Sequence, residues 1–371
     1  MTQRTSSVTG IILAGTYPWN NSAFARVVPR PLLPIAHRPL MSYAVSWLYA
    51  AGIRDAAVCG RNEMPALQAI IAPHSPHDMQ LAYYEDASPR GTAGTVCDAT
   101  AASDSDTFVV AEGTAIPNLS LAELLSAHQA SGALVTVVVH DDRRPNGPAG
   151  LQVPTGIYVI SRRALEQVPS SGFYDLKETL IPQLYRAGQH VGAYGVAEAS
   201  IRVQDWDTYL AVNAWMVERL AAGAVPPVEY HRSGASLIHR TASVAADAIL
   251  LGPVMVAPGA RIGSRAIVVG PCSIGADARL EDGVMVSRSA IWRRAVVRQG
   301  ARTDRTIVCD GVVVDADSRN DRAVLAVEGR GVTPGVAPLA AQLSARSAPQ
   351  LWRRVARALL NTDGAEAPQA Q

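Results

Sequence analysis

Two neighbouring segments near the N-terminus contain the residue types that bind phosphate. The apolar run Thr9–Ala14 leads into Gly15, and a glycine directly after a buried strand allows backbone N–H groups to approach an anionic ligand. The segment 29–34, Pro-Arg-Pro-Leu-Leu-Pro, carries a single charged side chain, Arg30. The residues that follow Thr16 are bulky or polar: Tyr17, Pro18, Trp19, Asn20 and Asn21. The sequence has the frame of a phosphate-binding loop, filled with side chains too large for a tight cradle.

Other reactive residue types are sparse. Lys177 is the one lysine among 33 basic residues. The four cysteines are far apart and show no Cys-x-x-Cys spacing, which argues against a zinc site or a disulfide framework and fits a reducing cytoplasm. No histidine falls within residues 244–316, and His239 stands just before that range.

The composition excludes several classes of function. A net charge of +1 gives no electrostatic footprint for nucleic acid. No apolar run is long enough for a transmembrane segment, and the N-terminus lacks the pattern of a signal peptide, so we expect a cytoplasmic location. A length of 371 residues indicates two or three domains.

The first part of the chain alternates between strand and helix patterns. Helical patterns span Leu40–Ala51 and Leu119–Ser131, each followed by a glycine. This alternation predicts an α/β domain over 8–225 with a Rossmann-like, mixed and mostly parallel sheet. Ligands of such sheets bind at the carboxyl ends of the strands, here the loops after Ala14 and Ala111. The expected strands are Thr9–Ala14, Asp55–Cys59, Gln80–Tyr84, Thr107–Ala111, Leu134–His140 and Gly156–Ile160.

The second part of the chain is a repeat. An aliphatic residue recurs at every sixth position, with glycine and proline between: Val244, Leu250, Val256, Ile262, Val268, Ile274, Leu280 and Val286. After one five-residue step the phase resumes at Ile291 and Val297 and then weakens towards Val314. A six-residue period predicts a left-handed parallel β-helix of about four coils over 235–316.

The C-terminal region divides into three expected parts. Residues 331–348 have the composition of a linker, and 362–371 that of a disordered tail. Residues 349–361 have the pattern of an amphipathic helix with Leu351, Trp352, Val355 and Leu359 on one face. Such a helix packs on its own chain or a sister subunit, or binds a membrane surface, and the sequence leaves these alternatives open.

The order of several motifs resembles that of the sugar-1-phosphate nucleotidylyltransferases, in particular the mannose-1-phosphate guanylyltransferase-like branch with a C-terminal hexapeptide β-helix. The resemblance covers roughly 8–315. In that family a first strand leads into Leu-Ala-Gly-Gly-x-Gly-Thr-Arg-Leu and then Pro-Lys-Pro-Leu-Leu-Pro. Further matches are Gly91-Thr92-Ala93-Gly94, 156–159, 175–182 and 207–213. The resemblance implies nucleotide-binding positions at Leu13, Ala14, Gly15, Arg30, Glu85, Gly91, Thr92 and Gly113.

The same resemblance exposes departures from the chemistry that it implies, in which a sugar phosphate attacks the α-phosphate of a nucleoside triphosphate on Mg²⁺. Thr114 and Arg202 occupy the positions of the two metal-binding aspartates. Glu112, two residues before Thr114, is a candidate displaced ligand. Arg30 replaces the family lysine, and either binds phosphate or is a structural arginine. The loop substitutions are Thr16, Pro18, Trp19 and Asn20, and only 141–155 remain where the family has a hairpin with a Glu-Lys-Pro motif.

Three functions follow from these observations. The first is a catalytically degenerate homologue, without cofactor, that serves as a regulatory or structural subunit and binds a nucleotide or nucleotide sugar. The second is an active nucleotidylyltransferase with a rebuilt site that uses Arg30, Arg202 and Glu112 together with Mg²⁺. The third is an acyltransferase of the β-helix, for which His239 is the nearest base. The expected partners are a second copy of the chain or an active paralogue, because parallel β-helices commonly assemble side by side.

Overall fold

A computed structural model describes residues 7–15, 28–61, 64–86, 90–141, 152–197 and 201–326. These residues form two compact units, one of 7–15 and 41–201 and the other of 28–40 and 202–326. The segments 28–40 and 202–225, expected in the α/β domain, thus belong to the same unit as the β-helix. The expected linker, amphipathic helix and tail over 331–371 lie outside the described residues.

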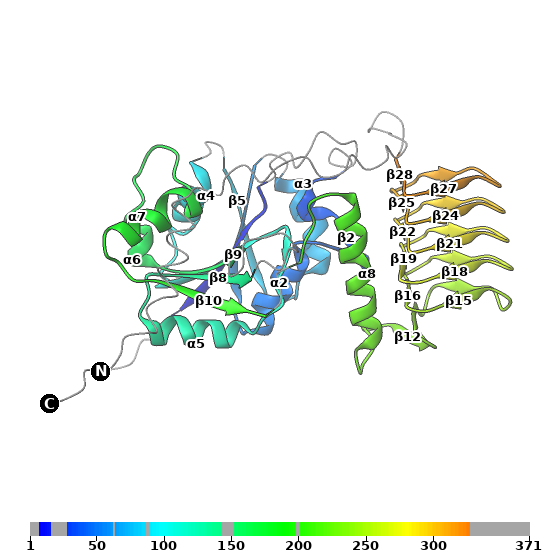
Figure 1. Cartoon of the computed structure of the whole chain (residues 1–371), viewed down its shortest axis with the longest axis horizontal. Helices are drawn as coiled ribbons and strands as arrows, with labels where there is room; N and C mark the ends of the chain where they lie inside the picture. The colour runs from blue at the N-terminus through cyan, green and yellow to red at the C-terminus, as the bar shows by residue number, and fades with distance from the viewer. Residues whose placement is uncertain are drawn as a thin grey trace. The chain divides into compact units, whose positions relative to one another are not determined.

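The first unit is built on a seven-stranded mixed sheet in the order β10-β8-β9-β6-β1-β4-β5 (Figure 1). Strand β9 runs antiparallel to its neighbours β6 and β8, and the other pairings are parallel. This confirms the predicted Rossmann-like α/β class. The strands are β1 Val8–Leu13, β4 Asp55–Gly60, β5 Gln80–Glu85, β6 Thr107–Glu112, β8 Val135–Asp141, β9 Gln152–Ser161 and β10 Val191–Val196.

Helices lie beside this sheet, and their ends follow local signals in the sequence. Helix α5 begins where the Ser120 hydroxyl accepts a hydrogen bond from the Glu123 amide, and it ends at Gly132 with φ +63°. The other elements of the unit are α2 Ser42–Ala50, α3 Met64–Ile71, α4 Gly91–Ala99, α6 Arg162–Leu165, α7 Ile181–Arg186, the 3-10 helix η2 Ala72–His74, the π-helix η3 Leu176–Leu180 and the strand β7 Ala115–Ile116.

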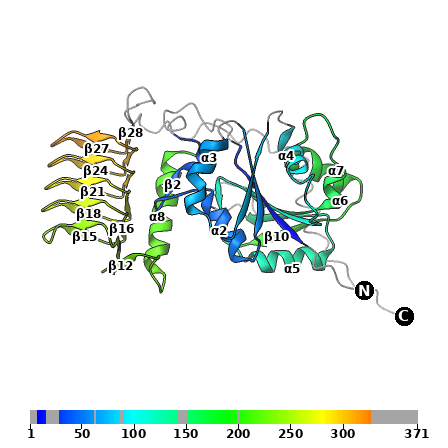
Figure 2. The ribbon, with the colours of Figure 1, turned by 180° about the vertical axis from the view of Figure 1, so that it is seen from behind.

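The second unit contains a parallel β-helix of stacked coils (Figures 1 and 2). One sheet holds β13 Ser236–His239, β16 Val254–Val256, β19 Cys272–Ile274, β22 Ala290–Ile291, β25 Ile307–Val308 and β28 Val324–Leu325, with β12 Tyr230–Ser233 antiparallel at its edge. The second sheet holds β14 Ser243–Val244, β17 Arg261–Ile262, β20 Arg279–Leu280, β23 Val296–Val297 and β26 Val313–Val314. The third holds β15 Ile249–Leu251, β18 Ile267–Val269, β21 Met285–Ser287, β24 Arg302–Asp304 and β27 Arg319–Asp321.

The strand register explains why the six-residue period fades. Early coils repeat every 18 residues, as in the pairing of Ile267 with Met285, and later coils every 17, as in the pairing of Met285 with Arg302. The shorter coils put Thr303 and Asn320 at the inward position of their strands, where earlier coils have leucine or valine. The strands therefore continue past the expected end at 316, to Leu325.

The rest of this unit packs on one side of the β-helix. Helix α8, Trp206–Ala222, lies beside β16 and β19, as both views show (Figures 1 and 2). Its buried residues recur at helical spacing: Tyr209, Val212, Asn213, Met216, Val217 and Ala221. The remaining elements are the 3-10 helix η1 Arg30–Leu32, the hairpin of β2 Pro34–Ile35 and β3 Arg38–Pro39, and the end of the strand β11 Ile201–Arg202.

Candidate functional site

The candidate site in the first unit lies where β1 and β6 end side by side. Leu13 pairs with Glu112 in the parallel register, and the Gly113 amide donates to the Leu13 carbonyl oxygen at 2.9 Å. The Ala14 amide donates to the Cys59 carbonyl oxygen of β4 at 2.7 Å. The loops that start at Gly15 and Gly113 therefore leave the same edge of the sheet, as the sequence predicted.

An ion pair at this edge joins a strand end to a distant helix. Lys177 Nζ donates to Glu112 Oε1 at 2.7 Å, and the two side chains are 38% and 22% exposed. Glu112 was a candidate metal ligand in the sequence, whereas Lys177 was not assigned a role. The one signal for it was its place within the family motif at 175–182.

The turn of η3 brings Lys177 to this position. Asp175 caps that helix, because its Oδ1 accepts hydrogen bonds from the Lys177 and Glu178 amides at 2.7 and 2.9 Å. Its Oδ2 accepts a hydrogen bond from the Thr92 hydroxyl at 2.9 Å, and that hydroxyl accepts one from the Leu176 amide at 2.9 Å. Thr92, an expected nucleotide-binding residue, is thus part of the frame that holds the lysine.

The Gly91-Thr92-Ala93-Gly94 motif forms the first turn of α4. Gly91 has φ +79°, and a Cβ placed on it would lie 2.6 Å from the Tyr174 carbonyl oxygen. That oxygen accepts hydrogen bonds from the Ala93 amide at 3.0 Å and the Gly94 amide at 3.2 Å. The motif therefore needs glycine for packing and backbone conformation, whatever it binds.

Acidic and thiol groups flank the same edge. Glu85 ends β5 and is exposed, and the next residue, Asp86, accepts a hydrogen bond from the Thr95 hydroxyl at 2.8 Å. Cys59 is buried in β4, and burial raises the pKa of its thiol to about 12, with a smaller contribution from the Asp86 charge. This thiol is protonated at neutral pH and is no nucleophile.

Arg30, an expected nucleotide-binding residue, and Arg202, a candidate for a rebuilt catalytic site, belong to the second unit. Arg30 begins η1, Arg202 ends β11, and both side chains are half-buried. The residues after Arg30 are held by α8, because the Tyr209 hydroxyl donates to the Pro34 carbonyl oxygen at 2.7 Å. The Asn213 side chain accepts a hydrogen bond from the Ala36 amide at 2.9 Å.

The same two α8 side chains contact the β-helix. Tyr209 accepts a hydrogen bond from Trp292 Nε1 at 2.7 Å, and Asn213 Nδ2 donates to the Ser273 hydroxyl at 3.0 Å. His37 Nε2 lies 3.1 Å from the Met255 carbonyl oxygen, so the ring donates there. Burial lowers the pKa of His37 to about 4, against a smaller opposing effect of this hydrogen bond. The Pro-Arg-Pro-Leu-Leu-Pro region is thus anchored to the coils through α8 and through His37.

His239 is not presented as a base for acyl transfer. Its Nδ1 lies 2.9 Å from the Thr241 hydroxyl, its Nε2 lies 3.1 Å from Glu229 Oε2, and its side chain is 6% exposed. Both ring nitrogens thus have partners at the first coil. This arrangement is that of a residue that closes the end of the β-helix.

The residues present at the family's metal position do not fit Mg²⁺. Thr114 supplies a neutral hydroxyl, and the neighbouring carboxylate of Glu112 is bound to an ammonium group. Within the described residues, no group of three or more His, Cys, Asp or Glu side chains could hold a metal ion. The same part of the chain has no helix long and apolar enough to cross a membrane. The substituted loop at 16–20 and the shortened segment 142–151 lie outside the described residues.

Comparisons with known proteins identify similar sequences and one partly matching structure. The family model described as nucleotidyl transferase matches residues 9–147. A mannose-1-phosphate guanylyltransferase of Mycobacterium tuberculosis is 27% identical over 284 residues, which cover 70% of this chain and 77% of the relative. A UTP–glucose-1-phosphate uridylyltransferase of Synechocystis is 24% identical over 328 residues, covering 78% and 84%. HddC from Yersinia pseudotuberculosis, solved in complex with GMP-PN, aligns with a TM-score of 0.49 and 14% identity over 56% of this chain and 99% of HddC.

Proposed function

This chain belongs to the sugar-1-phosphate nucleotidylyltransferase family, and we propose that it has kept the nucleotide-sugar pocket of that family as a binding site without turnover. In this proposal the protein is a regulatory or structural subunit in nucleotide-sugar or exopolysaccharide metabolism. Its ligand is a nucleotide or nucleotide sugar bound at the carboxyl ends of β1 and β6.

The observation that supports this proposal most is the ion pair between Glu112 and Lys177, 2.7 Å across. Transfer of a nucleotidyl group needs compensation for the negative charge that develops on the phosphates. The Lys177 ammonium neutralises the Glu112 carboxylate, so the pair offers a divalent cation no net negative charge. Thr114 stands in place of an aspartate, and no group of three or more His, Cys, Asp or Glu side chains among the described residues could hold the cation.

The same ion pair suits an anionic ligand that stays intact. The Lys177 side chain is 38% exposed, and its ammonium group lies at the edge where the strand-end loops gather. The diphosphate of a nucleotide sugar carries negative charge that a partly exposed ammonium can meet without a metal ion. Gly91 and Thr92 then supply the rigid turn beside the ligand, because Tyr174 and Asp175 fix them.

A thermal-shift screen of the full-length chain tests this function. Guanine and uracil nucleotides and their hexose conjugates are added with and without Mg²⁺, while pyrophosphate release from the matching triphosphates and sugar phosphates is followed in parallel. Ligand at about 100 times its dissociation constant stabilises by about 2.7 kcal/mol, a rise in Tm of about 5–10 °C. We expect such a shift for a nucleotide sugar, without dependence on Mg²⁺ and without pyrophosphate release.

Two variants make the screen specific. Lys177→Gln should weaken the nucleotide-sugar shift. The matched control is Arg54→Gln, which breaks an exposed ion pair to Asp78 at 3.0 Å on the same unit. Equal loss of the shift in both variants, or no shift with any nucleotide sugar in the wild type, would refute the binding site.

Lys177 also favours a second candidate, an active nucleotidylyltransferase with a rebuilt site. A partly exposed ammonium at the strand ends can contact the phosphate oxygens of a substrate, in the role that basic side chains have in phosphoryl transfer. This candidate predicts steady pyrophosphate release that is lost in Lys177→Gln or Arg30→Ala and kept in Arg54→Gln. Turnover with this pattern would replace the first proposal.

A further inference from the structure

One face of the β-helix is not covered by α8, and its surface changes character from coil to coil. The face consists of β15, β18, β21, β24 and β27, whose middle residues point inward and whose first and third residues point outward. The first residues form column one: Ile249, Ile267, Met285, Arg302 and Arg319. The third residues form column two: Leu251, Val269, Ser287, Asp304 and Asp321.

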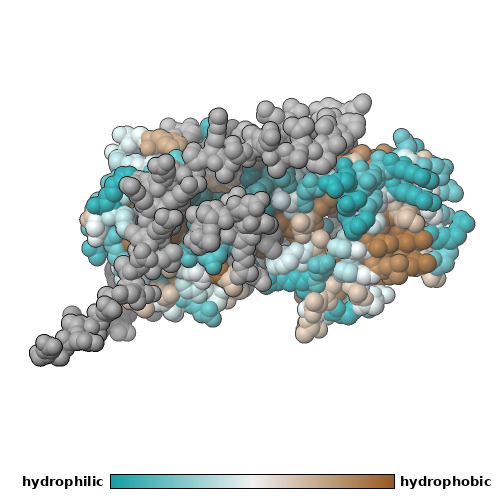
Figure 3. All heavy atoms as spheres, in the orientation of Figure 1, coloured by the Kyte–Doolittle hydropathy of each residue, from teal (hydrophilic) through white to brown (hydrophobic). Residues whose placement is uncertain are grey.

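The early coils of this face are apolar and exposed. Ile249 is 47% exposed, Leu251 51% and Met285 36%, and Ile267 and Val269 lie between them in the same two columns. Figure 3 shows the resulting hydrophobic area on the early coils, next to a hydrophilic area on the later ones. A contiguous apolar patch with a polar border is typical of an interaction surface.

The later coils of the face carry both signs of charge, arranged by column. Arg302 and Arg319 in column one are exposed, and no ion pair of either side chain is found within the described residues. Asp304 and Asp321 stand two residues further along the same strands, with side chains 29% and 64% exposed. Positive and negative columns thus run side by side on the later coils.

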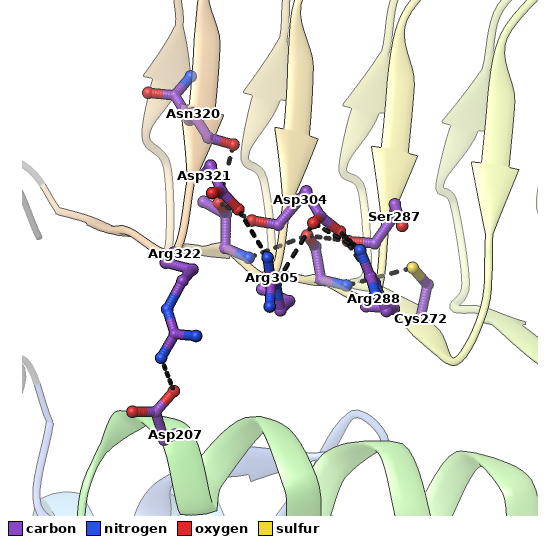
Figure 4. A network of polar contacts seen from close by, with 11 residues as sticks. Asp207, Cys272, Ser287, Arg288, Asp304, Arg305, Asn320, Asp321 and Arg322 are labelled. Carbon is purple, nitrogen blue, oxygen red and sulfur yellow. Dashed lines mark hydrogen bonds and ion pairs between the residues drawn. The ribbon is translucent and has the colours of Figure 1, made fainter. Parts of the chain in front are cut away.

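The two aspartates already hold the adjoining corner of the coils together (Figure 4). Arg288 donates to Asp304 at 2.6 and 2.8 Å, and Arg305 lies 3.3 Å from Asp304 and 3.5 Å from Asp321. Arg322, at the next level of this corner, lies 3.5 Å from Asp207 of α8. A carboxylate has about four acceptor positions, so Asp321, which is 64% exposed and paired with Arg305, can receive a further guanidinium group. The partly exposed Asp304 adds negative charge to the same column.

From these columns we infer that this face binds a second copy of the chain about a two-fold axis parallel to the stack of coils. Such an axis keeps each coil opposite the same coil of the second copy and places column one against column two. Apolar residues then meet apolar residues on the early coils. On the later coils, Arg302 and Arg319 of each copy meet Asp304 and Asp321 of the other.

Other arrangements of two copies are less favourable on the same surface. A two-fold axis along the strands would reverse the order of the coils, put Ile249 opposite Arg319, and bury arginine without an acidic partner. In a cyclic assembly, this face of one copy would contact the second sheet of the next copy. That contact would place Arg261 of β17 and Arg279 of β20 against the apolar coils. Only the axis along the stack pairs both the apolar and the charged parts.

The size of the face sets the expected strength of the dimer. Five coils spaced about 4.8 Å apart span roughly 20 Å, and two outward residues per strand give a narrow strip. A strip of this size is small for an obligate interface, so we expect a dimer whose dissociation can be measured by dilution.

Sedimentation velocity of the full-length chain over a range of concentrations tests the interface. The wild type should pass from monomer to dimer, and Leu251→Glu should weaken dimerisation at least about ten-fold by placing a charge in the apolar strip. The matched control is Val313→Glu, on the second sheet of the same β-helix and 48% exposed, which should dimerise as the wild type does. A wild type that stays monomeric, or equal effects of the two variants, would overturn the inference.

Charge variants test the direction of the axis. R319D and D321R should each weaken self-association, because each gives positions 319 and 321 charges of the same sign, so that like charges meet between the two copies. A mixture of R319D and D321R should form the heterodimer, since column one of each variant then meets a column of opposite charge in the other. The double variant R319D/D321R should dimerise like the wild type. Absence of the heterodimer in the mixture, with both variants folded, would exclude this two-fold arrangement.

Discussion

Substitution of Gly91 by alanine separates the structural role of the Gly-Thr-Ala-Gly turn from any role in binding. Gly91 has φ +79°, a conformation that costs alanine about 1–2 kcal/mol. The new Cβ would also lie 2.6 and 2.7 Å from the Tyr174 carbonyl oxygen and carbon. Backbone atoms cannot move aside as a flexible side chain can, and overpacking of this kind costs about 1–3 kcal/mol. Gly91→Ala should therefore destabilise the first unit by about 2–5 kcal/mol.

Gly132→Ala is the matched control. Gly132 also has a positive φ, +63°, at the end of α5, but a Cβ there meets no atom within 4 Å. We expect it to cost about 1–2 kcal/mol, from backbone conformation alone. The difference between the two variants isolates the contact with Tyr174.

Thermal denaturation of the two variants without ligand measures this difference, at about 2–4 °C in Tm for each kcal/mol in a unit of this size. Hydrogen exchange of the segment 91–99 gives a local readout, because the amides of Ala93 and Gly94 bond to the Tyr174 oxygen. Exchange there should rise in Gly91→Ala and stay unchanged in Gly132→Ala. Equal loss of stability in both variants would refute the account of the turn as a packing requirement.

Three further outcomes follow from the structure. The double-mutant cycle of Glu112→Gln and Lys177→Met should give a coupling of about 0.5–1 kcal/mol in chemical denaturation, since the pair is partly exposed, and a coupling of zero would contradict the ion pair. His37 has its folded-state pKa lowered to about 4, so the folded state binds fewer protons than the unfolded state between about pH 6.5 and 4. Stability should fall by about 3 kcal/mol as pH drops through that window. His37→Asn, which tolerates the positive φ at this position, should remove that part of the pH dependence in denaturation series. A Cβ at Gly15 meets no atom within 4 Å, so Gly15→Ala should change the free energy of unfolding by less than about 0.5 kcal/mol. A loss of nucleotide-sugar affinity in this variant, measured by calorimetry, would then indicate that the ligand approaches Gly15.

Regular elements were predictable because their signals are local. The apolar run before Gly15 became β1, and the glycine after Ser131 ended α5. The inward residues of the coils followed the six-residue period as far as Val297. Beyond it, polar residues at inward positions weakened the signal while the backbone pairing continued, because Thr303 is held in register by its strand neighbours. The six-residue period in the sequence reflects only the type of side chain at the inward positions. A coil can continue without it, because backbone hydrogen bonds to the neighbouring coils hold its strands.

The polar contacts were not predictable, because they join residues far apart in the chain. Lys177 lies 65 positions from Glu112, and no pattern in the sequence relates them. Tyr209 and Asn213 marked the end of a family motif in the sequence, but their partners Trp292 and Ser273 are 83 and 60 positions away. The spacing of apolar residues along α8 indicates which face of the helix is buried. It does not indicate which polar side chains on that face have buried hydrogen-bond partners.

The N-terminal motif, the strand with Gly15 and then Pro-Arg-Pro-Leu-Leu-Pro, is divided between the two units. The strand and Gly15 belong to the first unit, and the Pro-Arg-Pro-Leu-Leu-Pro segment belongs to the second. The Pro34 carbonyl oxygen binds the Tyr209 hydroxyl, which also binds Trp292 of the coils. These contacts need a fixed backbone around Pro34 and make no use of phosphate. A sequence can therefore match this motif for reasons of folding alone. The match is weak support for catalysis. Ligand binding and turnover depend instead on the side chains at the ends of β1 and β6.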